Sequence, residues 1–350
     1  MLKNKIFVKK MSVVFLLFIY GASTQPYIGR SQSVEDYNGF PIWSPTGTQI
    51  AFVSTRDGTH DIWLMNSDGS QQENLTPDYD NSIEIFPRWS PDGASIVFCS
   101  DVGGSDHLLQ VFIGNRTTRD LFAGIDLEAC QAEWSPDGTA LTFLGRAHQS
   151  YIEVWMVSLE PQITATQITD METFFGDPQW SPTGNQVSFL DFSEEASAVL
   201  RVVNINTREI SSLFEEDIIS YKWSPDGNLI AFNIQNETNY YENKIQILDV
   251  EEARIIAVSE TTSYGIENLI WSPQSDGVLF QAICNSGTDI FYFDFNLNTL
   301  DNLTRCDTSN DALPNFSPDG QSIVFQSDHD GYFTIWIMHR DGSDQHKLVD

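Results

Sequence analysis

The chain has 350 residues, of which 49 are acidic and 18 are basic, so its formal net charge at pH 7 is −31. This balance argues against a nucleic-acid-binding surface, which needs a stripe of Lys and Arg, and against attraction to anionic lipid. It favours a chain kept soluble by its own charge, or one whose partner is basic or a cation.

The first 24 residues have the features of a signal peptide. Four lysines precede an apolar run from Met11 to Tyr20, and Gly21 to Ser23 supply the small residues at which a signal peptidase could cut. The run is short for a membrane span, and no later segment could span a bilayer; an uncleaved anchor is the alternative. We therefore expect a periplasmic or secreted protein, with residues 25–37 as a linker or an extra edge strand.

From Asn38 onward the chain is an internal repeat built around the sequence Trp-Ser-Pro-Asp-Gly. The repeat recurs at intervals of 43 to 48 residues. The aromatic residues that open its copies are Trp43, Trp89, Trp134, Trp180, Trp223, Trp271 and Phe316. A phenylalanine follows nine residues after each of them: Phe52, Phe98, Phe143, Phe189, Phe232, Phe280 and Phe325. We interpret both aromatic positions as core between neighbouring repeats.

The first repeat shows the secondary structure that we expect in all of them. Four short strands, 40–43, 49–54, 61–65 and 72–76, are separated by turns and a loop. Proline at the second turn position and glycine at the end suit tight turns, and apolar residues alternate along the strands. Seven such units predict one all-β domain over residues 38–350, a seven-bladed β-propeller of four-stranded blades. Either the last blade uses only its own strands, ending with 346–349, or it borrows one from residues 25–37.

Four cysteines in an exported chain permit disulfides. From their places in the propeller topology we predict the pairs Cys99–Cys130 and Cys284–Cys306. The alternative is four free, half-buried thiols. No Cys-x-x-Cys occurs, so neither a zinc site nor a redox-active dithiol is indicated.

The repeat resembles the TolB-like β-propeller repeat over Asn38 to Asp350, nearly the whole mature chain. The resemblance lies in Trp-Ser-Pro-Asp-Gly followed by Ile-Ala-Phe, Asp-Ile-Trp-Leu-Met and Leu-Thr motifs, best matched by residues 42–76, 86–98 and 314–348. TolB proper is a periplasmic part of the Tol–Pal envelope system, with an N-terminal α/β domain before a six-bladed propeller. This chain departs from that pattern in its seven repeats, and we expect no such domain ahead of them.

One face of the predicted ring, which we call the loop face, gathers the loops between second and third strands and between successive blades. Loops on a rigid scaffold often carry binding sites, and these loops are rich in acidic residues. We expect the face to dock a basic protein segment or a divalent cation such as calcium; a generally acidic surface adapted to solubility is the alternative. The candidate residues are Glu84, Asp126, Asp177, Asp217, Glu267 and Asp311.

The residues just before the seven aromatics lie on the innermost strands and differ from blade to blade. If a ligand enters the central channel, Arg88, Glu133 and Lys222 could contact it. The alternative is a water-filled pore with structural polar residues.

Signatures of catalysis are absent: the sequence has no Gly-x-Ser-x-Gly elbow, no His-Glu-x-x-His and no phosphate-binding glycine loop. The six histidines are scattered. We therefore expect a monomeric, non-enzymatic protein-binding scaffold that has no obligate cofactor and does not bind nucleic acid. The alternative is a propeller enzyme, lyase-like or related to peptidases, with an unrecognised site.

Overall fold

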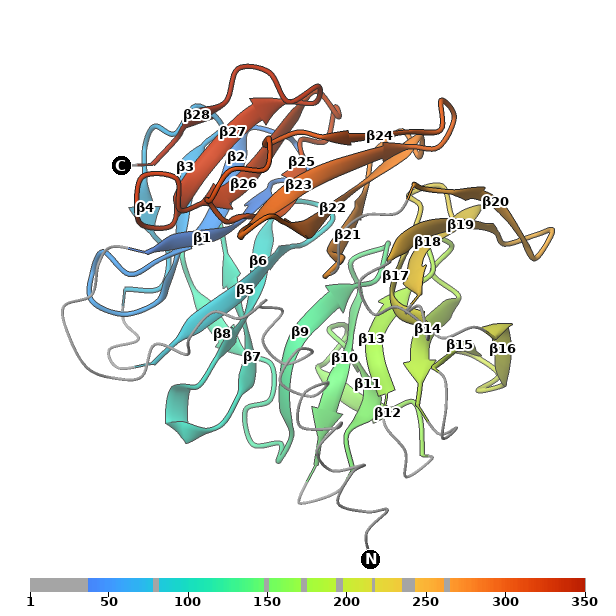
Figure 1. Ribbon diagram of the computed structural model, residues 1–350. Helices are drawn as coiled ribbons and strands as arrows, with labels where there is room; N and C mark the ends of the chain where they lie inside the picture. The colour runs from blue at the N-terminus through green and yellow to red at the C-terminus, as the bar shows by residue number, and fades with distance from the viewer. Residues whose placement is uncertain are drawn as a thin grey trace, which may run out of the picture. The chain divides into compact units, whose positions relative to one another are not determined.

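The computed structural model describes residues 37–77, 82–147, 151–170, 175–192, 198–215, 218–234, 243–260 and 265–349. Their strands form seven separate sheets, each of four antiparallel strands in chain order (Figure 1). This confirms the predicted seven-bladed β-propeller. Within the described residues the single helical segment is a 3₁₀ turn, Val102–Gly104. None of these residues forms a helix long and apolar enough to cross a membrane.

Each blade is one sheet, and its strands run from the innermost to the outermost. Blades 1 to 3 are β1 (Asn38–Trp43), β2 (Gln49–Ser54), β3 (Asp61–Asn66) and β4 (Glu73–Asn74); β5 (Glu84–Trp89), β6 (Ser95–Ser100), β7 (His107–Phe112) and β8 (Thr118–Asp120); β9 (Glu128–Trp134), β10 (Ala140–Arg146), β11 (Glu153–Ser158) and β12 (Thr164–Gln167).

Blades 4 to 7 repeat the order. They are β13 (Phe175–Trp180), β14 (Gln186–Asp191), β15 (Val199–Asn204) and β16 (Ile210–Glu215); β17 (Ile218–Trp223), β18 (Leu229–Ile234), β19 (Lys244–Asp249) and β20 (Arg254–Val258); β21 (Glu267–Trp271), β22 (Gly277–Cys284), β23 (Gly287–Asp294) and β24 (Thr299–Asn302); β25 (Asp311–Phe316), β26 (Ser322–Ser327), β27 (Thr334–His339) and β28 (His346–Lys347).

The Ser-Pro-Asp-Gly sequence closes the turn between the first two strands of a blade. In blade 2 the Ser90 hydroxyl donates to Asp92 Oδ1 (2.6 Å) and accepts a hydrogen bond from the Ser95 amide (3.0 Å). Gly93 has a φ of 70°, the left-handed conformation that glycine adopts without strain. We call the side of the ring that carries these turns the turn face.

The repeated aromatics pack neighbouring blades together. The seven phenylalanines nine residues after the motif aromatics are all at most 1 % exposed. Each of seven buried hydrophobic clusters combines residues of two successive blades, including blades 7 and 1. The indole N–H of Trp134 also donates to the backbone oxygen of Arg88 in the preceding blade (3.2 Å), and Trp89 and Trp271 make equivalent bonds.

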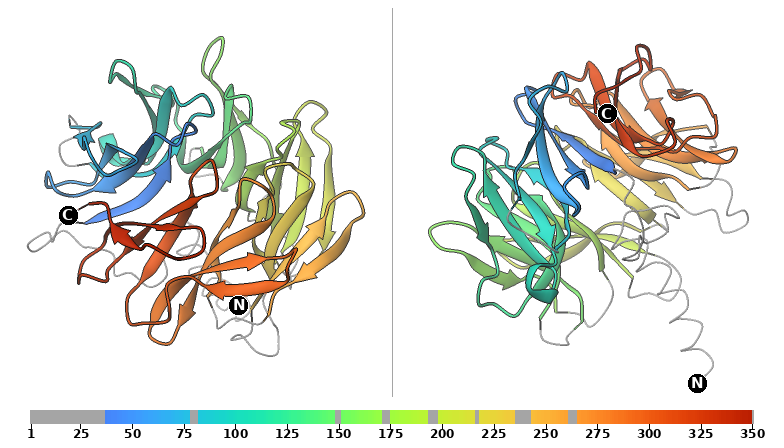
Figure 2. Two further views of the ribbon diagram at one scale, coloured as in Figure 1. Left: turned by 90° about the horizontal axis from the view of Figure 1, so that it is seen from above. Right: turned by 90° about the vertical axis from the view of Figure 1, so that its left-hand side faces the viewer.

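Among the described residues no strand is exchanged where the ring closes: blade 7 is made of β25 to β28, and blade 1 of β1 to β4. In the left view of Figure 2 the sheets follow one another in chain order until the red blade 7 lies beside the blue blade 1. The Asn38 amide donates to Phe333 O (2.9 Å), as the Glu84 amide donates to His60 O across the next interface (2.9 Å). Blade 7 thus has four strands of its own, as the first alternative expects. The second alternative falls on residues 25–37, of which 25–36 lie outside the described residues.

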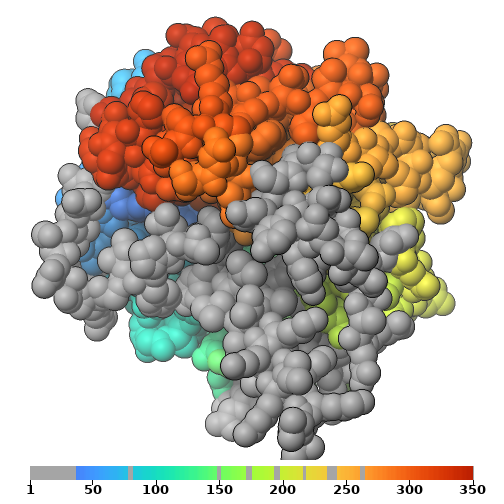
Figure 3. Space-filling view, in the orientation of Figure 1, coloured from blue at the N-terminus to red at the C-terminus, as the bar shows by residue number. Residues whose placement is uncertain are grey.

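The outer strands differ strongly in length. Those of five blades have two to four residues, whereas β16 has six and β20 has five. Blade 5, in amber, stands at the margin of the surface in Figure 3.

Candidate binding site at the channel mouth

The innermost strands bend where they line the ring. In six of the seven blades the residue three positions before the motif aromatic has a positive φ, and a register irregularity accompanies it. A bulge of this kind re-aims the side chains around it and tends to occur at functional places in sheets. The residues concerned are Phe40, Phe86, Gln131, Asp177, Asn268 and Leu313.

A cavity of about 290 Å³ opens between the first strands of blades 7, 1, 2 and 3 and the turns that follow them, which places it on the turn face. We call it the channel mouth. Most of its wall is aromatic or aliphatic, with one cationic, one anionic and one amide side chain. The lining residues are Ile42, Trp43, Ser44, Pro45, Arg88, Trp89, Glu133, Trp134, Asn315, Phe316 and Pro318.

Three of the residues predicted from the sequence form one charge network, and two of them, Arg88 and Glu133, line this cavity. Lys222 Nζ lies 3.1 Å from Glu133 Oε1, and Arg88 Nε lies 4.0 Å from the same oxygen. Lys222 belongs to blade 5 and Glu133 to blade 3, so this ion pair reaches across the inner edge of blade 4. Burial alone would raise the pKa of Glu133, but the charges of Lys222 and Arg88 outweigh it and hold that pKa below its usual value.

Asp177 of blade 4 stands beside this network. Burial raises the pKa of Asp177 to about 6, the charge of Glu133 adds to the effect, and Lys222 opposes it. Gln179 holds the carboxylate by donating to Asp177 Oδ2 (2.6 Å), and its Nε2 also donates to Tyr221 O (2.8 Å). Asp177 was predicted for the loop face, yet it is coupled to the charges of the innermost strands.

The remaining acidic candidates do not form one surface. Glu84 is 0 % exposed and Asp311 is 5 % exposed, so neither side chain can meet a partner. Glu267 is half-buried and accepts a hydrogen bond from Gln281 Nε2 (3.1 Å), whereas Asp126 is exposed. Asp217 lies outside the described residues. We therefore remove Glu84 and Asp311 from the proposed docking surface.

Several carboxylates near the loop face accept hydrogen bonds from residues of their own blade. The sequence analysis did not predict this structural role. Asp61, at the start of β3, accepts hydrogen bonds from Asn74 Nδ2 (3.1 Å) and the Thr76 hydroxyl (3.4 Å). Asp289 makes the same pair of bonds in blade 6, with Asn302 and Thr304. The recurring Asn-Leu-Thr sequence was the available signal, since its polar residues return to the start of the third strand.

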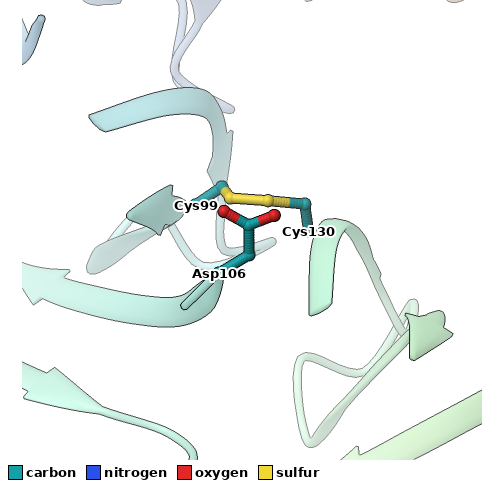
Figure 4. Close-up of side chains that lie close together, drawn as sticks. All are labelled: Cys99, Asp106 and Cys130. Carbon is teal, nitrogen blue, oxygen red and sulfur yellow. A yellow bond between two sulfur atoms is a disulfide. The ribbon is translucent and has the colours of Figure 1, made fainter. Parts of the chain in front are cut away.

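The cysteines form the two pairs that were predicted from the topology. Cys99 of β6 is bonded to Cys130 of β9, which joins blades 2 and 3, and Cys284 is bonded to Cys306. Asp106 lies beside the first disulfide (Figure 4).

Sulfur and carboxylate atoms gather at both disulfides. Cys99, Asp106 and Cys130 have potential ligand atoms within 4.8 Å of one another, as do Cys284, Asp289 and Cys306. A sulfur in a disulfide has no thiolate to give to a metal ion. Among the described residues no histidine belongs to a group of this kind.

A wider groove, of about 830 Å³, lies between blades 6 and 7. Its principal cation, Arg340, bonds Asp276 Oδ1 (2.6 Å) and lies over the Tyr292 ring, 5.1 Å from its centroid. Arg340 of blade 7 therefore serves to hold blade 6. The channel mouth is the better candidate, because Arg88 and Glu133 both line its cavity.

The fold places the chain in the class of seven-bladed β-propellers, and its innermost strands line a small cavity with aromatic and polar walls. The chain matches the TolB beta propeller domain family over residues 6–208 and 215–349, and it belongs to that family.

Individual relatives are distant. An uncharacterised protein of Agrobacterium fabrum is 26 % identical over 216 residues, which cover 59 % of this chain and 68 % of that protein. An oligogalacturonate lyase in complex with manganese is similar in structure, with a TM-score of 0.71 and 14 % identity, over 87 % of this chain and 89 % of that one.

The β-propeller domain of the Trilobed protease from Pyrococcus furiosus, which has an open velcro topology, is also similar. Its TM-score is 0.64 at 13 % identity, over 91 % of this chain and 97 % of that one. At these identities the two structural likenesses show the fold alone.

Proposed function

We propose that the protein is a non-catalytic binding propeller of the periplasm or the extracellular space, which holds a segment of another protein at the channel mouth. The observation that carries the proposal is the convergence of Arg88 and Glu133 on an aromatic-walled cavity. Aromatic walls supply contact area, and a few placed charges supply orientation and specificity.

Export is part of this proposal. The signal-peptide pattern of the first 24 residues supports it. The two disulfides support it as well, because disulfides form and persist in oxidising compartments.

The test is a pull-down from envelope extract with the tagged chain as bait, at low and high salt. Reversing the charge with Arg88→Glu should reduce recovery of the specific partner by about tenfold, because it places a second anion beside Glu133. The matched control is Arg208→Glu, the same change in an exposed turn of blade 4 between β15 and β16.

Equal recovery by the wild type, Arg88→Glu and Arg208→Glu would contradict docking at the channel mouth. If the wild-type chain recovered no specific protein at either salt concentration, the binding proposal would itself be contradicted.

The alternative is a propeller enzyme. Its support is the overall likeness to an oligogalacturonate lyase, and the cationic Arg88 and Lys222 could meet a sugar carboxylate. Incubation of the chain with oligogalacturonate and manganese distinguishes the two functions. Unsaturated product formed by the wild type and lost in Arg88→Glu would favour the enzyme.

A further inference from the structure

The outer edge of blade 5 is an exception among the seven blades. An outermost strand leaves one row of backbone N–H and C=O groups unpaired, and proteins protect such edges with short strands and charged residues. Five blades here follow that rule, with outer strands of two to four residues such as Glu73–Asn74 and His346–Lys347. Strand β20 is longer, with five residues, and its only charged residue is Arg254 at the start: residues 255–258 are Ile-Ile-Ala-Val.

The same edge exposes apolar side chains. Ile256 is 37 % exposed and Val258 is 41 % exposed, and the only other large hydrophobic residue that an outer strand exposes within the described chain is Ile210, of β16 in the neighbouring blade 4. Ile255 packs on the hydrophobic cluster between blades 4 and 5, and Ala257 packs on the cluster between blades 5 and 6. The amber segment at the margin of Figure 3 is this blade.

The backbone of β20 also offers a donor. The Ser259 amide donates inward to Ile245 O (2.8 Å). Because antiparallel strands direct successive N–H groups to opposite sides, the N–H of Val258 points away from β19, to the edge where the described residues place no further strand. A register irregularity between Ile247 and Leu248 leaves Ile256 as the inserted residue, and the strand from Ala257 onward is regular.

Charge decides what kind of segment fits this edge. Glu251 and Glu252 precede the strand and Glu260 follows it, all three exposed, and Arg254 pairs with Glu252. A second copy of the chain would bring its own net charge of −31 to the same place, which disfavours self-pairing.

We propose that the edge of β20 accepts an extended segment of a partner protein as a fifth strand of blade 5. The segment has β-branched residues in its middle, to cover Ile256 and Val258, and Lys or Arg at its ends, to meet Glu251 and Glu260. Main-chain hydrogen bonds hold such an added strand, and its side chains select it. This surface is separate from the channel mouth, so either proposal can fail alone.

The test uses the full chain and a labelled peptide, Lys-Ile-Thr-Val-Thr-Lys, with fluorescence anisotropy and amide hydrogen exchange as readouts. The wild type should bind the peptide and gain protection at Val258. Val258→Pro, which removes the outward N–H without changing charge, should bind at least about tenfold more weakly. The matched control, Leu297→Ser, removes a more exposed apolar side chain (72 % exposed) from a turn of blade 6 and should bind as the wild type does.

A second peptide, identical but N-methylated on every backbone amide, has the same charges and can donate a main-chain hydrogen bond from neither edge. Equal binding of the two peptides, or wild-type affinity in Val258→Pro, would overturn the proposal. Either result would show that the peptide binds by charge attraction and not by main-chain hydrogen bonds. Sedimentation that shows a dimer lost in Val258→Pro would overturn it in favour of a second copy. If Val258→Pro does not fold, Ile256→Ser replaces it. This variant removes exposed apolar area and keeps the backbone donor, and it should bind the peptide more weakly in the same way.

Discussion

At the scale of single residues, the buried carboxylates dominate the chemistry of the loop face. Glu84 Oε1 accepts hydrogen bonds from the hydroxyls of Ser82 (2.5 Å) and Ser100 (2.8 Å), whereas Glu84 Oε2 has no partner among the described residues. Burial raises the pKa of Glu84 to about 7, opposed by the two hydroxyls and helped by the charges of Asp61 and Asp101. The folded protein therefore binds a proton here that the unfolded chain releases near pH 4.5.

This shift predicts how stability depends on pH. Since the folded pKa is the higher one, the contribution of Glu84 is fully present below pH 4.5 and is lost as the pH rises through about 7. Glu84→Gln removes the charge but keeps the Oε1 acceptor. From pH 5 to pH 8 its free energy of unfolding should rise relative to that of the wild type by on the order of 2 kcal/mol, allowing for solvent screening.

Urea unfolding of both proteins at the two pH values measures the difference. Asp126→Asn, a change at an exposed carboxylate, is the control and should show no such trend. If the two stabilities stayed parallel across this range, Glu84 would be ionised in the folded protein.

At the scale of elements, neighbouring blades are joined by indole hydrogen bonds, packed aromatics and, between blades 2 and 3, the disulfide of β6 with β9. The bridged cysteines are 31 residues apart, and a cross-link of that span removes much chain entropy from the unfolded state. The second disulfide spans 22 residues, from the end of β22 to the segment after β24.

Replacing both Cys99 and Cys130 by serine should lower the free energy of unfolding by about 3 to 4 kcal/mol, as the loop-closure argument gives for this span. Guanidinium unfolding under oxidising conditions measures it. A reducing agent should remove most of the difference, because the wild type then loses the same bond. A difference that persisted after reduction would assign the loss to packing of the cysteine side chains.

At the scale of the whole molecule, the interface between blades 7 and 1 is the one place where the ring closes without a continuous chain. Gln326 Oε1 accepts hydrogen bonds from the Phe40 amide (3.2 Å) and the Tyr37 hydroxyl (3.1 Å). The equivalent contact between blades 6 and 7 is made by Gln281 Oε1, which accepts from the Leu313 amide (2.9 Å). The same chemistry thus serves an interface with a covalent connection and one without.

We call the interface between blades 7 and 1 the seam. This comparison predicts that the seam opens before the other interfaces between blades. Gln326→Ala and Gln281→Ala should each cost about 1 to 2 kcal/mol, since each leaves a backbone donor without its partner. Amide exchange at Phe40 should increase more in Gln326→Ala than exchange at Leu313 does in Gln281→Ala, because no chain connection holds blade 1 to blade 7. Equal increases at the two sites would show that the seam is no weaker than the other interfaces.

The amino-acid sequence by itself determined the architecture. A motif at intervals of 43 to 48 residues, with phenylalanines such as Phe52 and Phe98 nine residues after its aromatic, specifies a unit whose apolar faces can be covered only by neighbouring units. The topology then predicted both cysteine pairs, because it brings the ends of particular strands together. These features follow from local periodicity, which one chain displays directly.

Only the tertiary structure decided which charged side chains are buried and which of them pair with one another. The sequence cannot distinguish Glu84, which is buried, from Asp126, which is exposed, because both lie at or just before the start of a first strand and their burial depends on how the loops fold back. It did not reveal that Lys222 reaches Glu133, 89 residues away and two blades distant, since that contact exists only once the ring has formed. The contact between blades 7 and 1 likewise exists only in the closed ring, because it joins residues from the two ends of the repeat.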